Sequence, residues 1–171
     1  LQGALSELKG RGLVTLKRLA KPTVDELQRE LRQSDYHIFH FIGHGDFDAG
    51  TRAGVLLFED DQGKGRMVQS QVLKILLHDE STLRLAILNA CRGARSSQQD
   101  PLLGTAQSLV AAGVPAVVAM QFAVSDALAI TFARSFYEAL ADNVPVETAL
   151  GEARKTMFAN QTSNTLAEWG T

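Results

Sequence analysis

The sequence predicts an α/β fold in which a parallel sheet lies between helices. Three short apolar runs, at residues 36–43, 83–88 and 114–120, are typical of parallel strands that are buried on both faces. Segments with the apolar spacing of amphipathic helices separate these runs. Because strand-like and helix-like segments alternate along the chain, parallel strands with helices on the faces of their sheet are expected.

The first elements follow from alternation and from a capping pattern. Residues 13–19 alternate polar and apolar side chains, which predicts a strand near an edge of the sheet. A helix is expected after Pro22, because Thr23 and Glu26 have the spacing of a capping box, in which each side chain satisfies a backbone N–H group. Leu27 and Leu31 continue the buried face of this helix.

The middle of the chain predicts a loop, a hairpin and a short helix. Residues 45–53 are rich in glycine, aspartate and threonine and are expected to form a loop. The strand-like segments 54–58 and 66–68 flank a polar turn, which predicts a hairpin. A short helix is expected over residues 69–77, and the polar residues 95–100 are expected to form a mobile loop.

Three helices are predicted in the second half of the chain. A helix over residues 104–112 is expected to end at Gly113, which suits a left-handed cap. Ser125 is a candidate cap for a long helix, and Pro145 precedes a last one. Apolar side chains at helical spacing mark the buried faces of these last two helices: Leu128, Phe132, Phe136 and Leu140 in the first, and Ala149, Ala153 and Met157 in the second.

Composition narrows the function classes. The chain has 171 residues, 45% of them hydrophobic, and a formal net charge of -2, which suits a single globular domain over residues 1–171. No basic stripe suggests nucleic-acid binding, and no apolar run is long enough to span a membrane. A single cysteine cannot form an internal disulfide, which favours a reducing, cytoplasmic location. Because the chain lacks an initiator methionine, we expect it to be a fragment of a longer multidomain protein.

A histidine and the single cysteine follow two of the predicted buried strands. His44 comes after the first apolar run and Cys91 after the second, 47 residues later. Right-handed crossovers bring the carboxyl ends of parallel strands to one edge of a sheet, where ligands and chemistry gather. Residues 121–126 fall at the same predicted edge. The sequence therefore predicts that the thiol and the imidazole meet there.

A thiol beside an imidazole can act as a nucleophile with its base. His44 could take the thiol proton from Cys91 and later give it to a leaving amine. The backbone N–H groups of Gly45 and Cys91, at turns after the strands, could stabilise an oxyanion. A lone cysteine after an apolar strand is also a common small core residue, and local chemistry alone leaves both interpretations open.

Metal and cofactor chemistry is not expected. His40 lies four residues from His44 on the same face of the predicted strand, about 13 Å away at the usual rise per residue, too far to share an ion. No cluster of cysteine and histidine has the spacing of zinc ligands, and no phosphate-binding loop is present.

The segments that carry these residues resemble a known family. Residues 89–93, Asn-Ala-Cys-Arg-Gly, resemble the caspase signature Gln-Ala-Cys-X-Gly. Residues 39–45, 88–91 and 112–120, together with the helix that contains residues 136–140, resemble a CHAT domain. The resemblance covers roughly residues 14–157. CHAT domains are caspase-like modules, related to separase and metacaspases and often attached to tetratricopeptide repeats.

The resemblance implies a fold and a chemistry. It implies a caspase-like three-layer α/β/α sandwich with a mostly parallel central sheet and a Cys-His dyad. Carried over by position, His44 is the general base, Cys91 is the nucleophile, and the N–H groups of Gly45 and Cys91 form the oxyanion hole. It also implies a protein substrate and control by a repeat domain or a partner protein.

Some positions depart from the family pattern, so the sequence does not decide which residues form the substrate pocket. Members often have Trp-X-Val-X-Asp where residues 121–126 stand here without tryptophan. Asp126 could face a basic substrate residue, or it could be a favourable charge at a helix N-terminus. Asn89 replaces an aspartate of metacaspases. Asp46 and Asp48 are other acidic candidates near His44, or solvated loop carboxylates. The family's last strand follows a Trp-Gly-Thr like residues 169–171, so the final edge strand is expected to be missing.

Three functions follow from these observations. The first is a cysteine endopeptidase that cleaves a protein through a thioester intermediate. The second is a catalytically silent CHAT module that serves protein–protein interaction. The third is another thiol hydrolase or an amidotransferase, whose cysteine would stand on a tight elbow running into a helix, whereas residues 92–101 predict a longer loop.

Overall fold

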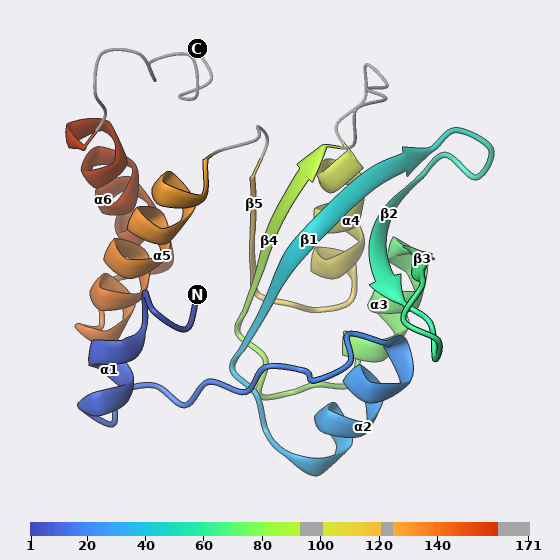
Figure 1. Ribbon diagram of the computed structural model, residues 1–171, viewed down its shortest axis with the longest axis horizontal. Helices are drawn as coiled ribbons and strands as arrows, with labels where there is room; N and C mark the ends of the chain where they lie inside the picture. The colour runs from blue at the N-terminus through green and yellow to red at the C-terminus, as the bar shows by residue number, and fades with distance from the viewer. Residues whose placement is uncertain (93–100, 121–124, 161–171) are drawn as a thin grey trace. The chain divides into compact units, whose positions relative to one another are not determined.

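Figure 1 shows the computed structural model, which describes residues 1–92, 101–120 and 125–160. These residues form two compact units. One unit holds the described residues between Leu19 and Ala123, with all the strands. The other combines Leu1–Arg18 with the described residues after 124 and is helical.

The sheet has five strands and is mixed. Its order is β3-β2-β1-β4-β5. β1 and β4 pair in parallel, as do β4 and β5, whereas β1–β2 and β2–β3 pair antiparallel. The strands are β1 (Ile38–Asp48), β2 (Ala53–Glu59), β3 (Gly65–Gln69), β4 (Leu85–Arg92) and β5 (Ala116–Ala119). The predicted α/β class is confirmed, and the mixed sheet flanked by helices is consistent with a caspase-like sandwich.

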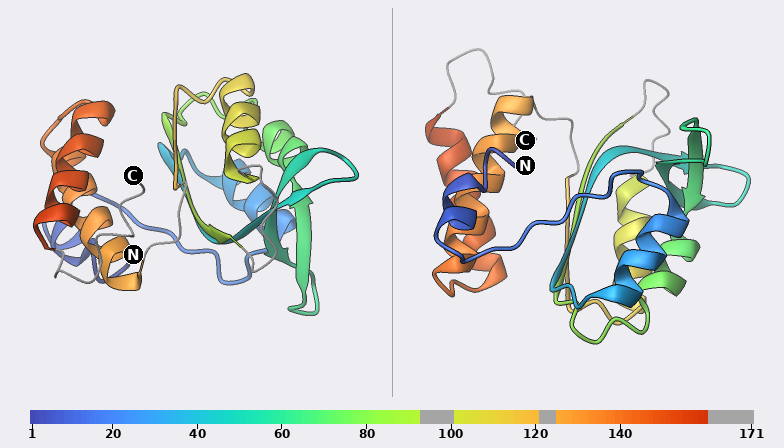
Figure 2. Two further views of the ribbon diagram at one scale, coloured as in Figure 1. Left: turned by 90° about the horizontal axis from the view of Figure 1, so that it is seen from above. Right: turned by 60° about the horizontal axis from the view of Figure 1, so that its bottom comes forward.

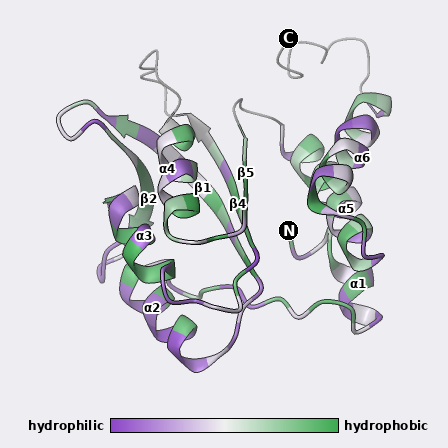
Figure 3. Cartoon of the chain, turned by 180° about the vertical axis from the view of Figure 1, so that it is seen from behind, coloured by the Kyte–Doolittle hydropathy of each residue, from purple (hydrophilic) through white to green (hydrophobic). Residues whose placement is uncertain are grey.

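Three helices of this unit gather beside the sheet: α2 (Val24–Gln33), α3 (Ser70–Leu77) and α4 (Pro101–Ala111) (Figure 2, right). Their buried side chains form one core with the strand side chains that face them, which lie at alternate positions along each strand. Figure 3 shows that α2 carries mainly hydrophilic residues, whereas α3 carries a larger hydrophobic share. The core residues include Leu27, Phe41, Leu56, Phe58, Leu73, Leu77, Ala86, Leu88, Leu102 and Leu109. This core holds β1 and β4 in place.

The helical unit contains α1 (Ser6–Gly10), α5 (Asp126–Ala141) and α6 (Val146–Ala159). α5 and α6 pack side by side. The rings of Phe132 and Phe136 stack with their centroids 5.4 Å apart, and Tyr137 meets Phe136 edge-on. The predicted apolar faces are confirmed by the buried residues Leu128, Phe132 and Phe136 of α5 and Ala149, Ala153 and Met157 of α6, while Leu140 is partly buried.

The predicted caps are largely confirmed. The side chain of Thr23 accepts a hydrogen bond from the backbone N–H of Glu26 (3.1 Å), so Thr23 is the N-cap of α2. The reciprocal half of the capping box is not formed, because the Thr23 N–H donates to the carbonyl of Lys21 and the Glu26 carboxylate pairs with Arg29. One end of the box is therefore used for an ion pair instead.

Two further turn residues behave as their chemistry predicts. Gly113 has a φ of 97° after α4, the left-handed conformation that glycine adopts without strain. Ser125 is the N-cap of α5, and its side chain accepts a hydrogen bond from the N–H of Leu128 at 3.4 Å. Both predictions at these helix ends are confirmed.

The strand predicted over residues 13–19 is wrong. The segment has no regular secondary structure, and no ladder pair includes it. Alternation describes which side chains face inward, but a strand also needs the backbone groups of a neighbour. This segment instead makes the connection at Arg18 between the two units.

The loop predicted over residues 45–53 is mostly a strand. β1 continues through Asp48, and Gly45–Asp48 pair with residues 53–56 of β2. Only residues 49–52 form the turn, with Arg52 at a φ of 54°. The turn is held by Asp48, whose carboxylate accepts hydrogen bonds from the backbone N–H of Gly50 and from the hydroxyl of Thr51. Five of the nine residues predicted to form a loop, 45–48 and 53, therefore belong to strands.

Predictions on residues 95–100, 121–124 and 169–171 lie outside the described residues. Within the described part of the chain, no helix is both long and apolar enough to cross a membrane.

Candidate active site

The register of β1 and β4 pairs the two candidate catalytic positions. Ile38 stands opposite Leu85, and the parallel ladder continues in step until Gly45 stands opposite Arg92. In this register His44 is the Cα partner of Cys91. Neighbouring strands lie about 4.8 Å apart. Two positions that are 47 residues apart in the sequence are thus adjacent in the sheet.

His44 lies inside a strand rather than after it. β1 runs four residues beyond His44 to Asp48, which corrects the expectation of a strand end there. The parallel ladder with β4 nevertheless stops one pair after His44, where β1 turns to pair with β2 alone. Cys91 is the last residue but one of β4. The His44 side chain is exposed.

Gly45, the predicted oxyanion donor, is buried and belongs to the ladders with both β4 and β2. A Cβ atom at this position would lie 3.2 Å from the side chain of Leu102 and 3.4 Å from those of Ala90 and Leu56. The absence of a side chain therefore lets α4 approach β1 at the end of the parallel ladder. This packing requirement accounts for glycine beside His44.

Gly43, on the other side of His44, has a similar role in packing. A Cβ atom there would lie 2.8 Å from Cζ of Phe41. The Phe41 ring thus lies over the backbone of Gly43, and its centroid is 5.5 Å from that of Phe58 in the core. Because Gly43 and Gly45 have no side chains, neighbouring core side chains can pack directly against the backbone of β1 on both sides of His44.

On the opposite face of β1, the side chains become exposed at Ile42, the position just before His44 on that face. Ile42, two residues before His44, shares its face because side chains alternate along a strand. The exposed fraction of Ile42 is 57%. Its register partner on β4 is Asn89, which is partly buried. By contrast, Leu85 and Ile87, earlier on the same face of β4, are 2% and 0% exposed.

The candidate carboxylates near His44 are engaged in local hydrogen bonds. Asp46 is partly buried within β1, and its side chain accepts a hydrogen bond from the Phe47 N–H at 2.8 Å. Bonds to Thr51 and Gly50 lower the pKa of Asp48 below its usual value. Asp46 is therefore a strand residue on the face of His44, not part of the solvated loop that its surroundings in the sequence suggest.

Asp126 is the first residue of α5 and is exposed. It follows the capping residue Ser125, where a negative charge interacts favourably with the helix dipole. Asp126 belongs to the helical unit, whereas His44 and Cys91 belong to the unit with the sheet. The position of Asp126 fits the predicted role of a favourable charge at a helix N-terminus. Its role in a substrate pocket stays a prediction.

His40 differs from His44 in its surroundings. It lies four residues earlier on the same face, at the row of the fully buried Ile87. Burial lowers the pKa of His40 to about 4, so its imidazole is neutral near pH 7. It is therefore suited to the packed part of the sheet rather than to proton transfer at neutral pH. Among the described residues, no group of three or more histidine, cysteine, aspartate or glutamate side chains could hold a metal ion.

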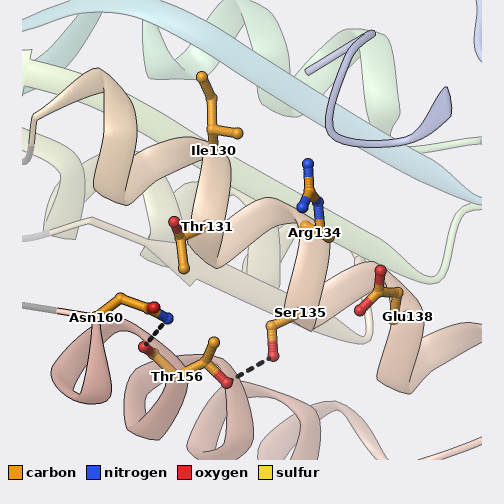
Figure 4. Close-up of a pocket in the computed structure, with 7 residues that line it drawn as sticks. All are labelled: Ile130, Thr131, Arg134, Ser135, Glu138, Thr156 and Asn160. Carbon is orange, nitrogen blue, oxygen red and sulfur yellow. Dashed lines mark hydrogen bonds between the residues drawn. The ribbon is translucent and has the colours of Figure 1, made fainter. Parts of the chain in front are cut away.

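A cavity of about 390 Å³ lies on the helical unit (Figure 4). Its lining comes from α5 and from α6 with the residue that follows it. The hydroxyls of Ser135 and Thr156 are 3.1 Å apart, and Asn160 donates to the carbonyl of Thr156 at 2.8 Å. The Ser135–Thr156 contact connects the two helices, whereas the Asn160 bond is local to the end of α6. The cavity is therefore a feature of helix packing.

A comparison with protein families identifies the domain to which these strands and helices belong. The family model of the CHAT domain matches residues 3–170, essentially the whole chain. The chain belongs to the CHAT domain family. CHAT domains are caspase-like, which agrees with the α/β fold and its mixed sheet. No curated protein matches the chain.

One residue at the CHAT site was missed from the sequence. The sequence predicts that Ile42 belongs to a strand buried on both faces, but Ile42 is exposed two residues before His44. The spacing of two residues from His44 was the available signal, because it places both side chains on one face. The exposure could not be predicted, since it depends on where the packed part of the face ends.

Proposed function

We propose that this CHAT domain is a cysteine endopeptidase in which Cys91 is the nucleophile and His44 is its base. The register that makes His44 and Cys91 Cα partners supports this proposal most directly. It brings a histidine and the only cysteine of the chain to adjacent positions at the end of the parallel ladder. The exposure of His44 and the caspase-like family are further support.

The proposed chemistry balances in two steps. His44 takes the thiol proton, and the thiolate forms a bond to the carbonyl carbon of the scissile peptide. Collapse of the tetrahedral intermediate breaks the C–N bond, and His44 gives its proton to the leaving amine. Water then attacks the thioester while His44 takes its proton, and the carboxylic acid and the thiol are released. The N–H groups of Gly45 and Cys91 are the proposed donors to the oxyanion.

The partners and control of the peptidase are part of the same proposal. The substrate is a protein, and a repeat domain or a partner protein regulates cleavage. No cofactor is required by the chemistry, because both steps need only the thiol, the imidazole and water.

The single cysteine makes the dyad directly measurable. Iodoacetamide alkylation of Cys91, followed by intact-mass spectrometry as a function of pH, reports the thiolate fraction at one site. A base beside the thiol is expected to allow rapid alkylation at pH 6 to 7, below the usual thiol pKa of about 8.5. His44→Ala is expected to slow alkylation in this range about tenfold or more. His78→Ala removes another exposed histidine and is the matched control.

Cleavage of a peptide library by the purified chain tests the reaction itself. Cys91→Ala and His44→Ala are expected to abolish cleavage, while circular dichroism shows that both variants remain folded. Cleavage that persists in either variant would contradict the proposal. If His44→Ala leaves the alkylation profile unchanged and no peptide is cleaved, the silent interaction module is the correct function instead.

A further inference from the structure

We infer that the segment that runs from the end of α1 towards α2 binds an acidic peptide segment of a partner protein. This basic connector, residues 9–21, contains no acidic residue and five basic ones: Lys9, Arg11, Lys17, Arg18 and Lys21. The rest of the chain has 12 basic against 19 acidic residues. Positive charge is therefore concentrated in one short segment of an otherwise acidic chain. The inference goes beyond the proposed peptidase, because no residue of the connector belongs to the candidate active site.

The charges of the basic connector are accessible. All five basic side chains are exposed. The guanidinium of Arg11 lies 4.0 Å from the carboxylate of Glu7 on α1, an exposed pair that contributes little. Neither Arg18 nor Lys21 forms a salt bridge with another residue that the structure describes. The second half of the connector therefore offers two cations to the carboxylates of a partner.

Backbone hydrogen bonds hold the connector near both of its ends. The N–H of Leu13 donates to the carbonyl of Leu8 at 2.9 Å, and the N–H of Glu59 in β2 donates to the carbonyl of Pro22 at 2.9 Å. Between these anchors, residues 14–20 belong to no helix and to no strand ladder of the described chain. A segment that is held at both ends loses less conformational freedom on binding than a free one, which favours its use as a binding site.

The spacing of the two cations suits an extended acidic peptide. Arg18 and Lys21 are three residues apart, at most about 11 Å along the chain. In an extended peptide, carboxylates on alternate residues repeat about every 7 Å along one side, so two of them can contact both cations. Arginine can also bind a carboxylate through two parallel hydrogen bonds. An extended segment with several glutamates or aspartates is therefore the partner that this spacing fits.

Composition favours a peptide over a nucleic acid or an anionic membrane. The connector has no aromatic residue on which a base could stack. A nucleic acid or a membrane is also much larger than the connector and would meet the acidic remainder of the chain, whose charge repels it. A short acidic peptide needs only the connector.

Fluorescence anisotropy with a labelled peptide tests the inference on the full chain. The probe is a fluorescein-labelled octapeptide that alternates glutamate and serine, and the same peptide with glutamine for glutamate is the charge control. The double variant Arg18→Gln/Lys21→Gln is expected to raise the Kd of the glutamate peptide about fivefold, because two exposed ion pairs are lost. Arg154→Gln/Lys155→Gln removes the same charge from two exposed neighbours in α6 and is the matched control, with an expected change of less than about twofold. Circular dichroism checks that both double variants are folded.

Weaker binding in the connector variant alone supports the inference. It is overturned if the glutamate peptide does not bind, if the glutamine peptide binds equally well, or if the two double variants lose affinity equally. A single-stranded DNA oligomer, or vesicles with about 30% phosphatidylserine, that bind more tightly than the peptide and depend on Arg18 and Lys21 also overturn it, because the connector then serves a nucleic acid or a membrane. None of these results decides the peptidase, which the alkylation of Cys91 tests separately.

Discussion

At the scale of single residues, the candidate site combines two residues that are proposed to be catalytic with two glycines that allow close packing. His44 and Cys91 stand opposite each other, and Gly43 and Gly45 flank His44 on the core side of the strand. Glycine at these positions allows Phe41 and Leu102 to approach the backbone of β1. The His-Gly pair therefore has a structural cause as well as a proposed catalytic one.

Gly43→Ala tests the close approach of Phe41. A methyl group would lie 2.8 Å from the Phe41 ring, which is buried against Phe58 and cannot move freely. The free energy of unfolding is expected to fall by about 1–3 kcal/mol, the usual cost of overpacking. Urea denaturation followed by circular dichroism measures it. Gly151→Ala in α6, where a Cβ meets nothing within 4 Å, is the matched control and is expected to add about 0.5–1 kcal/mol. Equal effects of the two variants would contradict the packing argument.

Local chemistry predicted the residue types of the site but not their register. The residues His44 and Cys91 could be selected from the sequence because each follows an apolar run. That they are direct partners depends on the relative shift of two strands, which the core sets through side chains such as Phe41 and Leu88. The exposure of Ile42 was unpredictable for the same reason.

At the scale of elements, capping decides where helices begin. The hydroxyl of Thr23 starts α2, and this residue is only 8% exposed. The Glu26 carboxylate pairs with Arg29 instead of completing the capping box. The start of α2 therefore depends on a single side-chain cap.

Thr23→Ala is expected to lower the free energy of unfolding by about 1 kcal/mol, because the Glu26 N–H loses its partner. Thr23→Ser keeps the hydroxyl and is expected to retain most of that free energy. Thr15→Ala, at an exposed threonine outside any regular element, is expected to change it by less than about 0.5 kcal/mol. Chemical denaturation compares the three variants. An equal loss in Thr23→Ser and Thr23→Ala would show that the hydroxyl is not the cap.

The elements also show why sequence patterns fail at particular places. The sequence predicts α2, α3, α5 and α6 because their caps and apolar spacing are local, as at Ser125, but it does not predict α1 and places the start of α4 three residues late. Strands need partners: residues 13–19 have the alternation without a partner, and Gly45–Asp48 have the composition of a loop but pair with β2. Pairing is a property of the fold that no local pattern contains.

At the scale of the whole molecule, the stability of the fold depends on pH through a few perturbed groups. Burial lowers the pKa of His40, and hydrogen bonds to Thr51 and Gly50 lower the pKa of Asp48. Burial, followed by the charges of Asp35 and Asp79, raises the pKa of Glu80. A lowered pKa destabilises the fold as the pH falls, whereas the raised pKa of Glu80 acts in the opposite direction.

His40 dominates the range just below neutral pH. Its pKa is 6.5 in the unfolded chain and about 4 in the fold, so the unfolded state binds the extra proton between these values. The free energy of unfolding is expected to fall by about 3 kcal/mol as the pH drops from 7 to 4, with most of the loss below pH 6. Urea denaturation at a series of pH values measures this, and His40→Asn is expected to flatten the slope between pH 6 and 4.5. His78→Asn, at an exposed histidine, should keep the slope. If the free energy of unfolding of His40→Asn still falls steeply between pH 6 and 4.5, another group takes up the proton on unfolding. That result would contradict the role assigned to His40.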